Sequence, residues 1–418
     1  MALSGVGWMS LLFCIPLMLM FKTRLFGVFD PLNMFLVTRV APMLSAMVIC
    51  AYKYTSNFYF IIFVISGILF LATLYLATPK ENDNQGSIKS EAVILILRLG
   101  IIFFLIKVAI LINATGEIPL FSKGGSDAYI RFDVENKVGS GFLLGLGSID
   151  LILLSFSIPL LTLNISRVMA IMLLGLAMIV GMSSGKKSSL LVIFLAIYFG
   201  EYMRTIFLTN QVYFFIKVKY IVIGIMMSVA WAAWTFFQTS SIELNLHDIS
   251  LIGDVLDFVM YQWAYPFILF ASGALHQFFQ EYQVNRSLYF FHSILSPLGF
   301  PAFKFSVGPS INTFINGEIS GNGINPTFII EGYVLAGGLL PVYAMLVGLI
   351  IGKCRAYILR IKCVEYRVVF SALFIPILYT LAVDGLLYIK MVYVLLMITI
   401  IILLPAIYLF NNQNELHD

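Results

Sequence analysis

The stretch FYFIIFVISGILFLATLYLA, residues Phe58–Ala77, contains no charged side chain. A helix rises about 1.5 Å per residue, so this stretch would extend about 30 Å, the thickness of the hydrocarbon core of a bilayer. The same character extends through the chain, because 61% of its 418 residues are hydrophobic and only 11% are charged. A soluble domain carries about 25% charged residues. The composition therefore excludes a soluble globular protein, and the 15% of aromatic residues excludes a disordered chain.

We predict an all-α polytopic integral membrane protein, with residues 1–418 as a single membrane domain of about eleven spans (ten to twelve). The predicted spans are Val6–Phe21, Asn33–Tyr52, Phe58–Ala77, Ala92–Ile112, Gly141–Leu163, Val168–Met182, Ser188–Met203, Tyr220–Phe237, Thr327–Gly352, Val368–Tyr388 and Met391–Phe410. A further apolar stretch, Leu251–Ser272, is interrupted by Asp254 and Asp257. We interpret it as an interfacial helix within a loop, and a twelfth span is the alternative.

Lysine and arginine in the loops predict the orientation in the membrane, because cytoplasmic loops carry an excess of them. The odd-numbered loops hold thirteen of these residues, whereas the even-numbered loops hold nine, spread over much more chain. The stretch Lys353–Arg367 is the most basic. We therefore expect the odd-numbered loops inside and the even-numbered loops outside. Two outer loops are long, residues 113–140 and residues 238–326, and we expect the second to form short interfacial helices.

Charged residues inside membrane spans are costly and are therefore functional candidates. The seven that we find are Arg39, Arg98, Lys107, Asp150, Glu201, Glu331 and Asp384. Lys107 and Asp384 lie about 6–8 Å below the outer ends of their spans and could reach an outer cavity. We expect Arg39 and Arg98 to snorkel or to pair with a carboxylate that holds the bundle together. Glu201 is expected to be solvated at the inner end of its span.

Two further segments on the predicted outer side contain candidate binding residues. In GMSSGKKS, residues 181–188, the glycine spacing does not fit a nucleotide-binding loop, but Lys186 and Lys187 beside Gly and Ser backbone N–H groups would suit an anion. Contact with lipid headgroups is the alternative for these lysines. Glu331 lies near Tyr333 and the glycine pair 337–338, a pattern typical of helix packing and binding. We expect the two glycines to permit close helix contact.

A resemblance to a known family rests on IPLF at 118–121, Arg131, PTFIIEGY at 326–333, the glycine pair 337–338 and Gly348. Together with the layout of the whole chain, these features resemble the Wzy-type O-antigen polymerases, the polymerases of oligosaccharide repeat units. The layout consists of many spans, two large outer loops and a basic inner loop before the last hairpin. Some members of this family carry an Arg-x10-Gly pattern, which neither Arg131 nor Arg286 satisfies here, so we carry over Arg131 alone.

The resemblance implies a glycosyltransferase-C-like membrane bundle in the bacterial inner membrane, with an active site that faces the periplasm. Such an enzyme transfers a growing glycan from undecaprenyl diphosphate to the non-reducing end sugar of another lipid-linked repeat unit. It would need no metal and no other cofactor. Its partners would be the lipid-linked donor and acceptor, membrane lipids and a chain-length regulator protein, and nucleic acid would not be among them.

This reaction makes two demands on the site. Positive charge must stabilise the diphosphate leaving group, and the candidates on the predicted outer side are Arg131, Lys186, Lys187, Arg286 and Lys107. A base must accept the proton of the acceptor hydroxyl. Our candidates are Glu331, His292 and Asp384, chosen from an outer set that also contains His247, His276 and Glu318.

Two alternatives stay open. A flippase or transporter of the same lipid-linked oligosaccharide would be expected to have matching halves, whereas the loops of this chain are unevenly distributed. An O-antigen ligase would share the donor and the layout but would use a lipid A core as acceptor, and the sequence does not separate it from a polymerase.

Overall fold

The computed structural model describes residues 6–25, 27, 29–80, 90–115, 167–183, 189–209, 222–223, 226, 264–276 and 327–382. Within these ranges the chain is helical and forms no β-strand. Three of the described helical segments are long and apolar enough to cross a membrane, namely Pro31–Tyr54, Phe58–Ala77 and Phe328–Leu359, the last of which contains α17, η7 and α18. The prediction of an α-helical protein with membrane-spanning segments is therefore confirmed, and the count of eleven spans stays a prediction.

The helices that the structure describes begin and end close to the predicted spans. Two of them, α1 (Val6–Phe21) and α4 (Phe58–Ala77), have the predicted bounds. The other elements are η1 (Lys22–Arg24), α2 (Pro31–Phe35), η2 (Leu36–Val40), α3 (Ala41–Tyr54), α5 (Ser90–Thr115), α10 (Arg167–Ser183), α11 (Ser189–Thr209), α17 (Phe328–Ala336), η7 (Gly337–Leu339), α18 (Leu340–Leu359) and α19 (Val364–Ala382). The predicted spans Gly141–Leu163 and Met391–Phe410, and nearly all of Tyr220–Phe237, lie outside the described residues.

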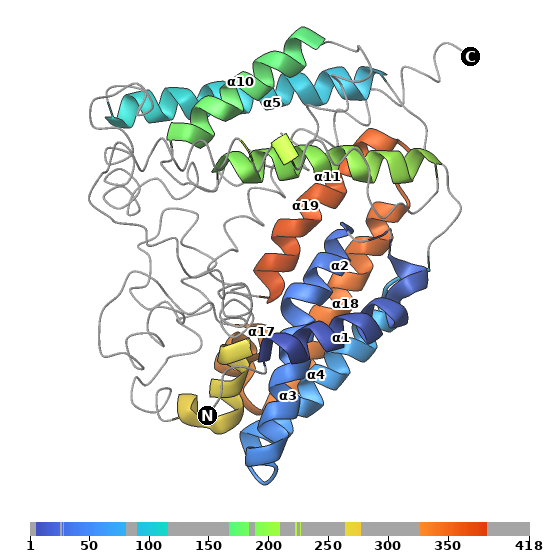
Figure 1. Ribbon diagram of the computed structural model, residues 1–418, viewed down its shortest axis with the longest axis vertical. Coiled ribbons are helices and arrows are strands. Elements are labelled where there is room, and N and C mark those ends of the chain that lie inside the picture. Colours follow the sequence, from blue (N-terminus) through green and yellow to red (C-terminus); the bar gives the residue numbers. More distant parts are fainter. Residues whose placement is uncertain are drawn as a thin grey trace.

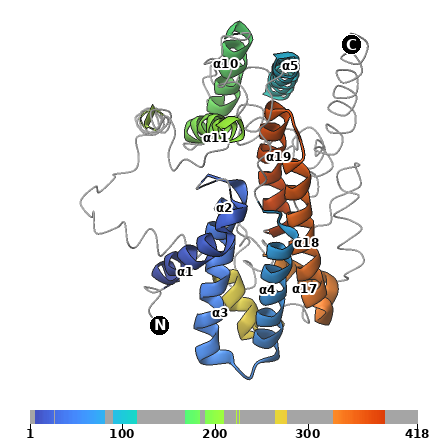
Figure 2. The ribbon, with the colours of Figure 1, turned by 90° about the vertical axis from the view of Figure 1, so that its right-hand side faces the viewer.

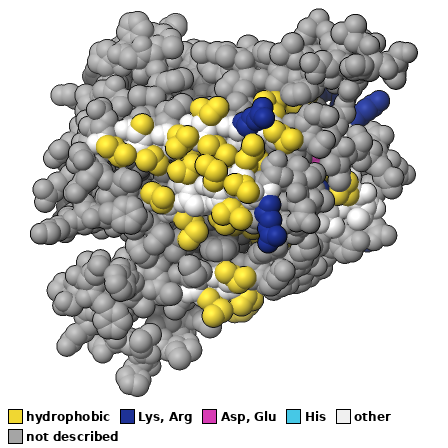
Figure 3. All heavy atoms as spheres, turned by 90° about the horizontal axis from the view of Figure 1, so that it is seen from above, with side chains coloured by type: hydrophobic (Ala, Val, Ile, Leu, Met, Phe, Trp, Pro, Cys, Tyr) yellow, Lys and Arg dark blue, Asp and Glu magenta, His cyan; other side chains and the backbone are white. Residues whose placement is uncertain are grey.

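The helices form two groups, as Figures 1 and 2 show. In the first group, α3, α4 and α18 run along the long axis of the molecule, and α4 and α18 pack side by side. In the second group, α5, α10 and α11 lie at one end of these helices, with α5 and α11 oriented across them. The face of the molecule seen in Figure 3 carries many apolar side chains and a few lysine or arginine side chains. Exposed apolar residues of α5 and α10 include Ile102, Leu105 and Ile171.

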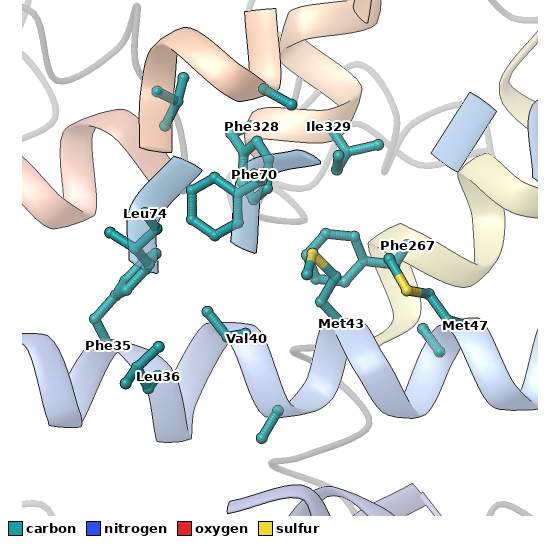
Figure 4. Close-up of a cluster of buried hydrophobic side chains, with 14 of the residues drawn as sticks. Phe35, Leu36, Val40, Met43, Met47, Phe70, Leu74, Phe267, Phe328 and Ile329 are labelled. Atoms are coloured by element: carbon teal, nitrogen blue, oxygen red, sulfur yellow. The ribbon is translucent and has the colours of Figure 1, made fainter. Parts of the chain in front are cut away.

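The core lies where α2, η2 and α3 face α4 and α17 (Figure 4). Leu36, Val40 and Met43 follow the three- and four-residue spacing that places side chains on one face of a helix. That face meets Phe70 of α4, whose ring lies 4.6 Å from the ring of Phe328 in α17. The segment 264–276 also enters this core, because the ring of Phe267 stacks on Phe63 of α4.

The predicted span Thr327–Gly352 consists of two helices rather than one. The first, α17, ends at Gly337, whose φ of 57° and ψ of −123° suit glycine and no residue with a side chain. Gly332 then lies against α18, since a Cβ placed on it would be 2.4 Å from Cδ1 of Tyr343. The second helix, α18, has 20 residues and is long enough to span a membrane alone.

The expected role of the glycine pair is therefore wrong for Gly338. A Cβ on Gly338 would have no described atom within 4 Å, so this residue does not bring two of the described helices together. Its neighbour Gly337 instead permits the turn between α17 and α18. The contact between helices comes from Gly332, Gly348 and Gly352, each of which faces another helix at short range.

We expect the substitution Gly337→Ala to lower the free energy of unfolding by about 1–3 kcal/mol, because alanine at this φ and ψ is strained. Gly338→Ala is the matched control, since its φ is not positive and the space around it is open; we expect a change within about 0.5 kcal/mol. Unfolding by SDS titration in detergent micelles measures both. Equal effects of the two substitutions would contradict the assigned turn.

Candidate functional site

A buried ion pair closes one end of the long helices, which we call the arginine end and define by Arg24, Asp30, Thr78 and Arg355. Asp30 is fully buried and Arg355 is 3% exposed. Arg355 donates from Nη1 to Oδ1 of Asp30 (2.7 Å) and from Nη2 to Oδ2 (2.5 Å). Asp30 also caps α2 by accepting from the backbone N–H of Leu32 at 2.8 Å. This carboxylate therefore fixes both the start of α2 and the end of α18.

A second arginine, Arg24, connects the arginine end to the residue that follows α4 by a hydrogen bond. Arg24 donates to the carbonyl oxygen of Thr78, directly after α4, and its guanidinium lies 4.1 Å from the centre of the Tyr75 ring. The carbonyl of Arg24 in turn accepts a bond from Nη2 of Arg355 at 2.7 Å. Three segments far apart in sequence are thus tied together, and the charge count places all three on the same side of the membrane.

A second polar network lies between α11 and the start of α19. Nε of Arg204 lies 3.8 Å from Oε1 of Glu365, and both side chains are 7% exposed. Glu201 interacts electrostatically with Arg204 and is 5% exposed, so the expectation that Glu201 is solvated is wrong. Arg367 donates to the carbonyl of Ile361 at 2.7 Å. Burial raises the pKa of the Cys363 thiol to about 11, which keeps this thiol protonated at neutral pH.

The opposite end of the long helices, which we call the tyrosine end, carries three partly exposed rings with polar atoms and the buried ring of Phe270. It is defined by Tyr59, Phe270, His276 and Tyr333. The ring of Tyr59 lies 5.2 Å from His276, 5.8 Å from Tyr333 and 6.0 Å from Phe270. Phe270 and Tyr333 are 5.2 Å apart. The side chains of Tyr59 and Tyr333 also interact with each other electrostatically. The cluster thus combines aromatic faces with an imidazole and two hydroxyl groups.

Local structure explains how His276 reaches Tyr59. Asn57 caps α4 by accepting from the N–H of Tyr59 at 3.0 Å, and its Nδ2 donates to the carbonyl of Ser272 at 3.1 Å. The segment 264–276 then turns at Gly273, where φ is +80°. A Cβ on Gly273 would lie 3.1 Å from Cδ2 of Tyr59, so glycine also allows the close approach. The turn closes with a bond from the N–H of His276 to the carbonyl of Gly273 at 3.0 Å.

Glu331 lies on α17, two residues before Tyr333, and is 0% exposed. It occupies the first turn of α17, where the positive end of the helix dipole favours a carboxylate. Its charge also acts on Tyr343 of α18. In this arrangement Glu331 supports the joint between α17 and α18, and its carboxylate is not on the surface that a substrate would meet.

No model of a known protein family, no curated protein and no solved structure matches this chain. The function of the tyrosine end has to be inferred from the chemistry of its side chains.

The structure describes two of the predicted site residues. Glu331 lies at the tyrosine end, whereas Lys107 belongs to α5, in the group of helices at the opposite end (Figure 1). The structure therefore does not bring these two residues together. The other predicted residues lie outside the described part of the chain, and they are Arg131, Lys186, Lys187, Arg286, His292 and Asp384.

Nothing in the sequence singles out Tyr59, and His276 is one of several histidines on the predicted outer side. Tyr59 is hard to recognise because it stands in a span with many aromatic residues. One local pattern does indicate where the helix begins. Asn57 stands directly before a long apolar run, as a helix N-cap typically does, so it marks the N-terminal end of the span. Nothing local shows that residues 59, 276 and 333 meet.

Proposed function

We propose that the protein is a polymerase of lipid-linked repeat units, with the tyrosine end as its acceptor-sugar site. It would transfer a growing glycan from undecaprenyl diphosphate to the non-reducing end sugar of a second lipid-linked unit. The chain would lie in a bacterial inner membrane with the tyrosine end toward the periplasm. The segments that meet at this end are those that the charge count assigns to the outer side, which supports this orientation.

The observation that carries the proposal is the cluster of Tyr59, His276 and Tyr333, partly exposed at one end of membrane-spanning helices. Binding sites for small molecules are mostly apolar and contain a few well-placed polar groups. Here the ring faces would hold a sugar ring, and the tyrosine hydroxyls would bond to its hydroxyl groups. The other end of the bundle contains the buried pair Asp30–Arg355, whose charges bind each other.

Within this proposal His276 is the base that accepts the proton of the attacking acceptor hydroxyl, since histidine is the side chain that most often takes this role. The hydroxyl oxygen then bonds to the anomeric carbon of the donor sugar, and the bond from that carbon to the diphosphate oxygen breaks. The diphosphate leaves as an anion, which needs nearby cations. Arg131 and Arg286 remain our candidates for that role, whereas Lys186 and Lys187 connect α10 to α11, in the group of helices at the opposite end.

We expect His276→Gln to lower the rate of chain growth by about 10²-fold or more, because glutamine cannot accept the proton. The assay uses purified protein and only the lipid-linked repeat unit, with polymer length read on a gel. Lys53→Gln is the matched control, since Lys53 is exposed near the same end, on α3, and should leave the rate unchanged. Wild-type rates in folded His276→Gln protein would contradict the assigned base.

The same assay separates the polymerase from its alternatives. Chain growth without nucleotide, ion gradient or lipid A core would select the polymerase. Movement of the lipid-linked unit across a vesicle membrane without chain growth would select the flippase. Product that forms only when lipid A core is added would select the ligase.

A further inference from the structure

One face of α18 is exposed and changes character near the arginine end. We call it the α18 row and define it by Leu346, Ile350, Lys353, Tyr357 and Arg360, all of which are exposed. Successive members are four or three residues apart, a spacing that aligns side chains along one face of a helix. Arg360 follows α18 directly and keeps helical backbone angles, φ −79° and ψ −14°. An apolar surface thus leads directly into a cationic one.

The length of the α18 row suits the layers of one membrane leaflet. The helix rises about 10 Å from Leu346 to Lys353 and about 10 Å more from Lys353 to Arg360. A leaflet has about 15 Å of hydrocarbon beside a headgroup region of about 5–8 Å. Tyrosine is enriched at the boundary between these layers, and long cationic side chains near helix ends extend toward the surface. The apolar part of the row therefore suits acyl chains, and the part from Lys353 onward suits headgroups.

The positive charge of the α18 row is not balanced by carboxylates of the described side chains. These carboxylates are at most 7% exposed, and they are Asp30, Glu201, Glu331 and Glu365. Asp30, which belongs to the arginine end, already binds Arg355. The C-terminus of α18 carries about half a negative charge from the helix dipole, which is less than the two positive charges of Lys353 and Arg360. The row therefore attracts an anionic group.

We propose that the α18 row binds one anionic phospholipid of the leaflet at the arginine end. Lys353 and Arg360 bind the phosphate, and the hydroxyl of Tyr357 donates to a lipid oxygen. An acyl chain lies along Ile350 and Leu346. A zwitterionic lipid is less favoured, because its ammonium group repels the two cations. The charge count assigns this end to the cytoplasmic side, where the membrane surface is negative. The site is separate from the tyrosine end and does not depend on the reaction proposed there.

The test measures lipid bound to the purified full chain in neutral detergent, by native mass spectrometry. The probes are phosphatidylglycerol and phosphatidylcholine with identical acyl chains. We expect the first phosphatidylglycerol to bind wild type at least about tenfold more tightly than phosphatidylcholine, because two cations act on its headgroup. Lys353→Gln combined with Arg360→Gln should lower this preference to less than about threefold. Lys353→Arg combined with Arg360→Lys keeps both charges and should keep the preference.

The matched control is Lys53→Gln combined with Arg167→Gln, which removes one exposed lysine and one exposed arginine elsewhere. It should leave the lipid preference unchanged. An unchanged preference in the folded double variant of Lys353 and Arg360 would overturn the proposal, as would an equal loss in the control.

Two soluble competitors test the kind of ligand. Glycerol 3-phosphate has the phosphate without acyl chains, so an equimolar amount should not displace phosphatidylglycerol from the wild-type chain. Displacement would overturn the assignment to a lipid and leave an anion site. Hexaglutamate carries negative charge on a peptide and should not displace the lipid either. If it did, the proposal would be overturned in favour of an acidic protein segment.

Discussion

Asp30→Asn is expected to lower the free energy of unfolding by about 3–5 kcal/mol, because it leaves the charge of Arg355 buried without its counter-ion. Asparagine has nearly the same shape as aspartate, and its side-chain oxygen can still accept the bond from the N–H of Leu32 that caps α2. The loss would therefore come from the ion pair and not from the helix cap. The measurement is unfolding by SDS titration in detergent micelles.

A double variant separates the buried charge from the loss of a contact. Asp30→Asn combined with Arg355→Met removes both charges, and we expect it to recover most of the lost stability, since apolar replacements of buried pairs are often neutral. Lys353→Met is the matched control, because Lys353 lies two residues away on α18 and is exposed; its effect should stay within about 0.5 kcal/mol. A double variant as unstable as Asp30→Asn would show that the penalty does not come from an uncompensated charge.

The helices could be predicted from the sequence because lipid imposes a simple rule. Backbone groups in a bilayer must be satisfied within the segment, so a long uncharged stretch has to be a helix. This is why α1 and α4 have the predicted bounds. The same rule could not place the break at Gly337, since a glycine pair in an apolar run is compatible with close packing as well as with a turn. The backbone angles at Gly337 decide between the two.

The contacts between distant residues could not be predicted. Asp30 and Arg355 are 325 positions apart, and each alone looks like a loop residue near the end of a span. By sequence Arg355 belongs to the basic stretch Lys353–Arg367 that predicts the orientation, but its side chain is buried. The tyrosine end poses the same difficulty, because its rings come from three separate segments. The sequence favours Glu331 as the base, which lies two residues before Tyr333 but is fully buried.

Gly348→Ala is expected to destabilise the contact between α4 and α18 by about 1–3 kcal/mol, the usual cost of overpacking. A Cβ on Gly348 would lie 2.7 Å from the backbone carbonyl oxygen of Phe70 and 2.4 Å from Oγ1 of Thr73. One turn later, a Cβ on Gly352 would lie 2.5 Å from the Cβ of Ala77. The two glycines form the small-x-x-x-small pattern that lets helices in membranes approach closely. Because backbone atoms of α4 oppose the new methyl group, rotation of a side chain cannot relieve the clash.

Gly348→Ala should also alter the tyrosine end, the proposed acceptor-sugar site. Tyr59 is at the start of α4, and Tyr333 belongs to α17, which is joined to α18 through the turn at Gly337. Any shift of α18 against α4 changes the spacing of these two rings, so Gly348→Ala should slow chain growth in protein that remains folded. Gly175→Ala in α10 is the matched control, since no described atom lies within 4 Å of its Cβ position and alanine favours a helix. We expect that variant to retain full activity and stability. If Gly175→Ala lost activity and stability, the assigned contact between α4 and α18 would be contradicted. The same holds if Gly348→Ala kept its activity and its stability.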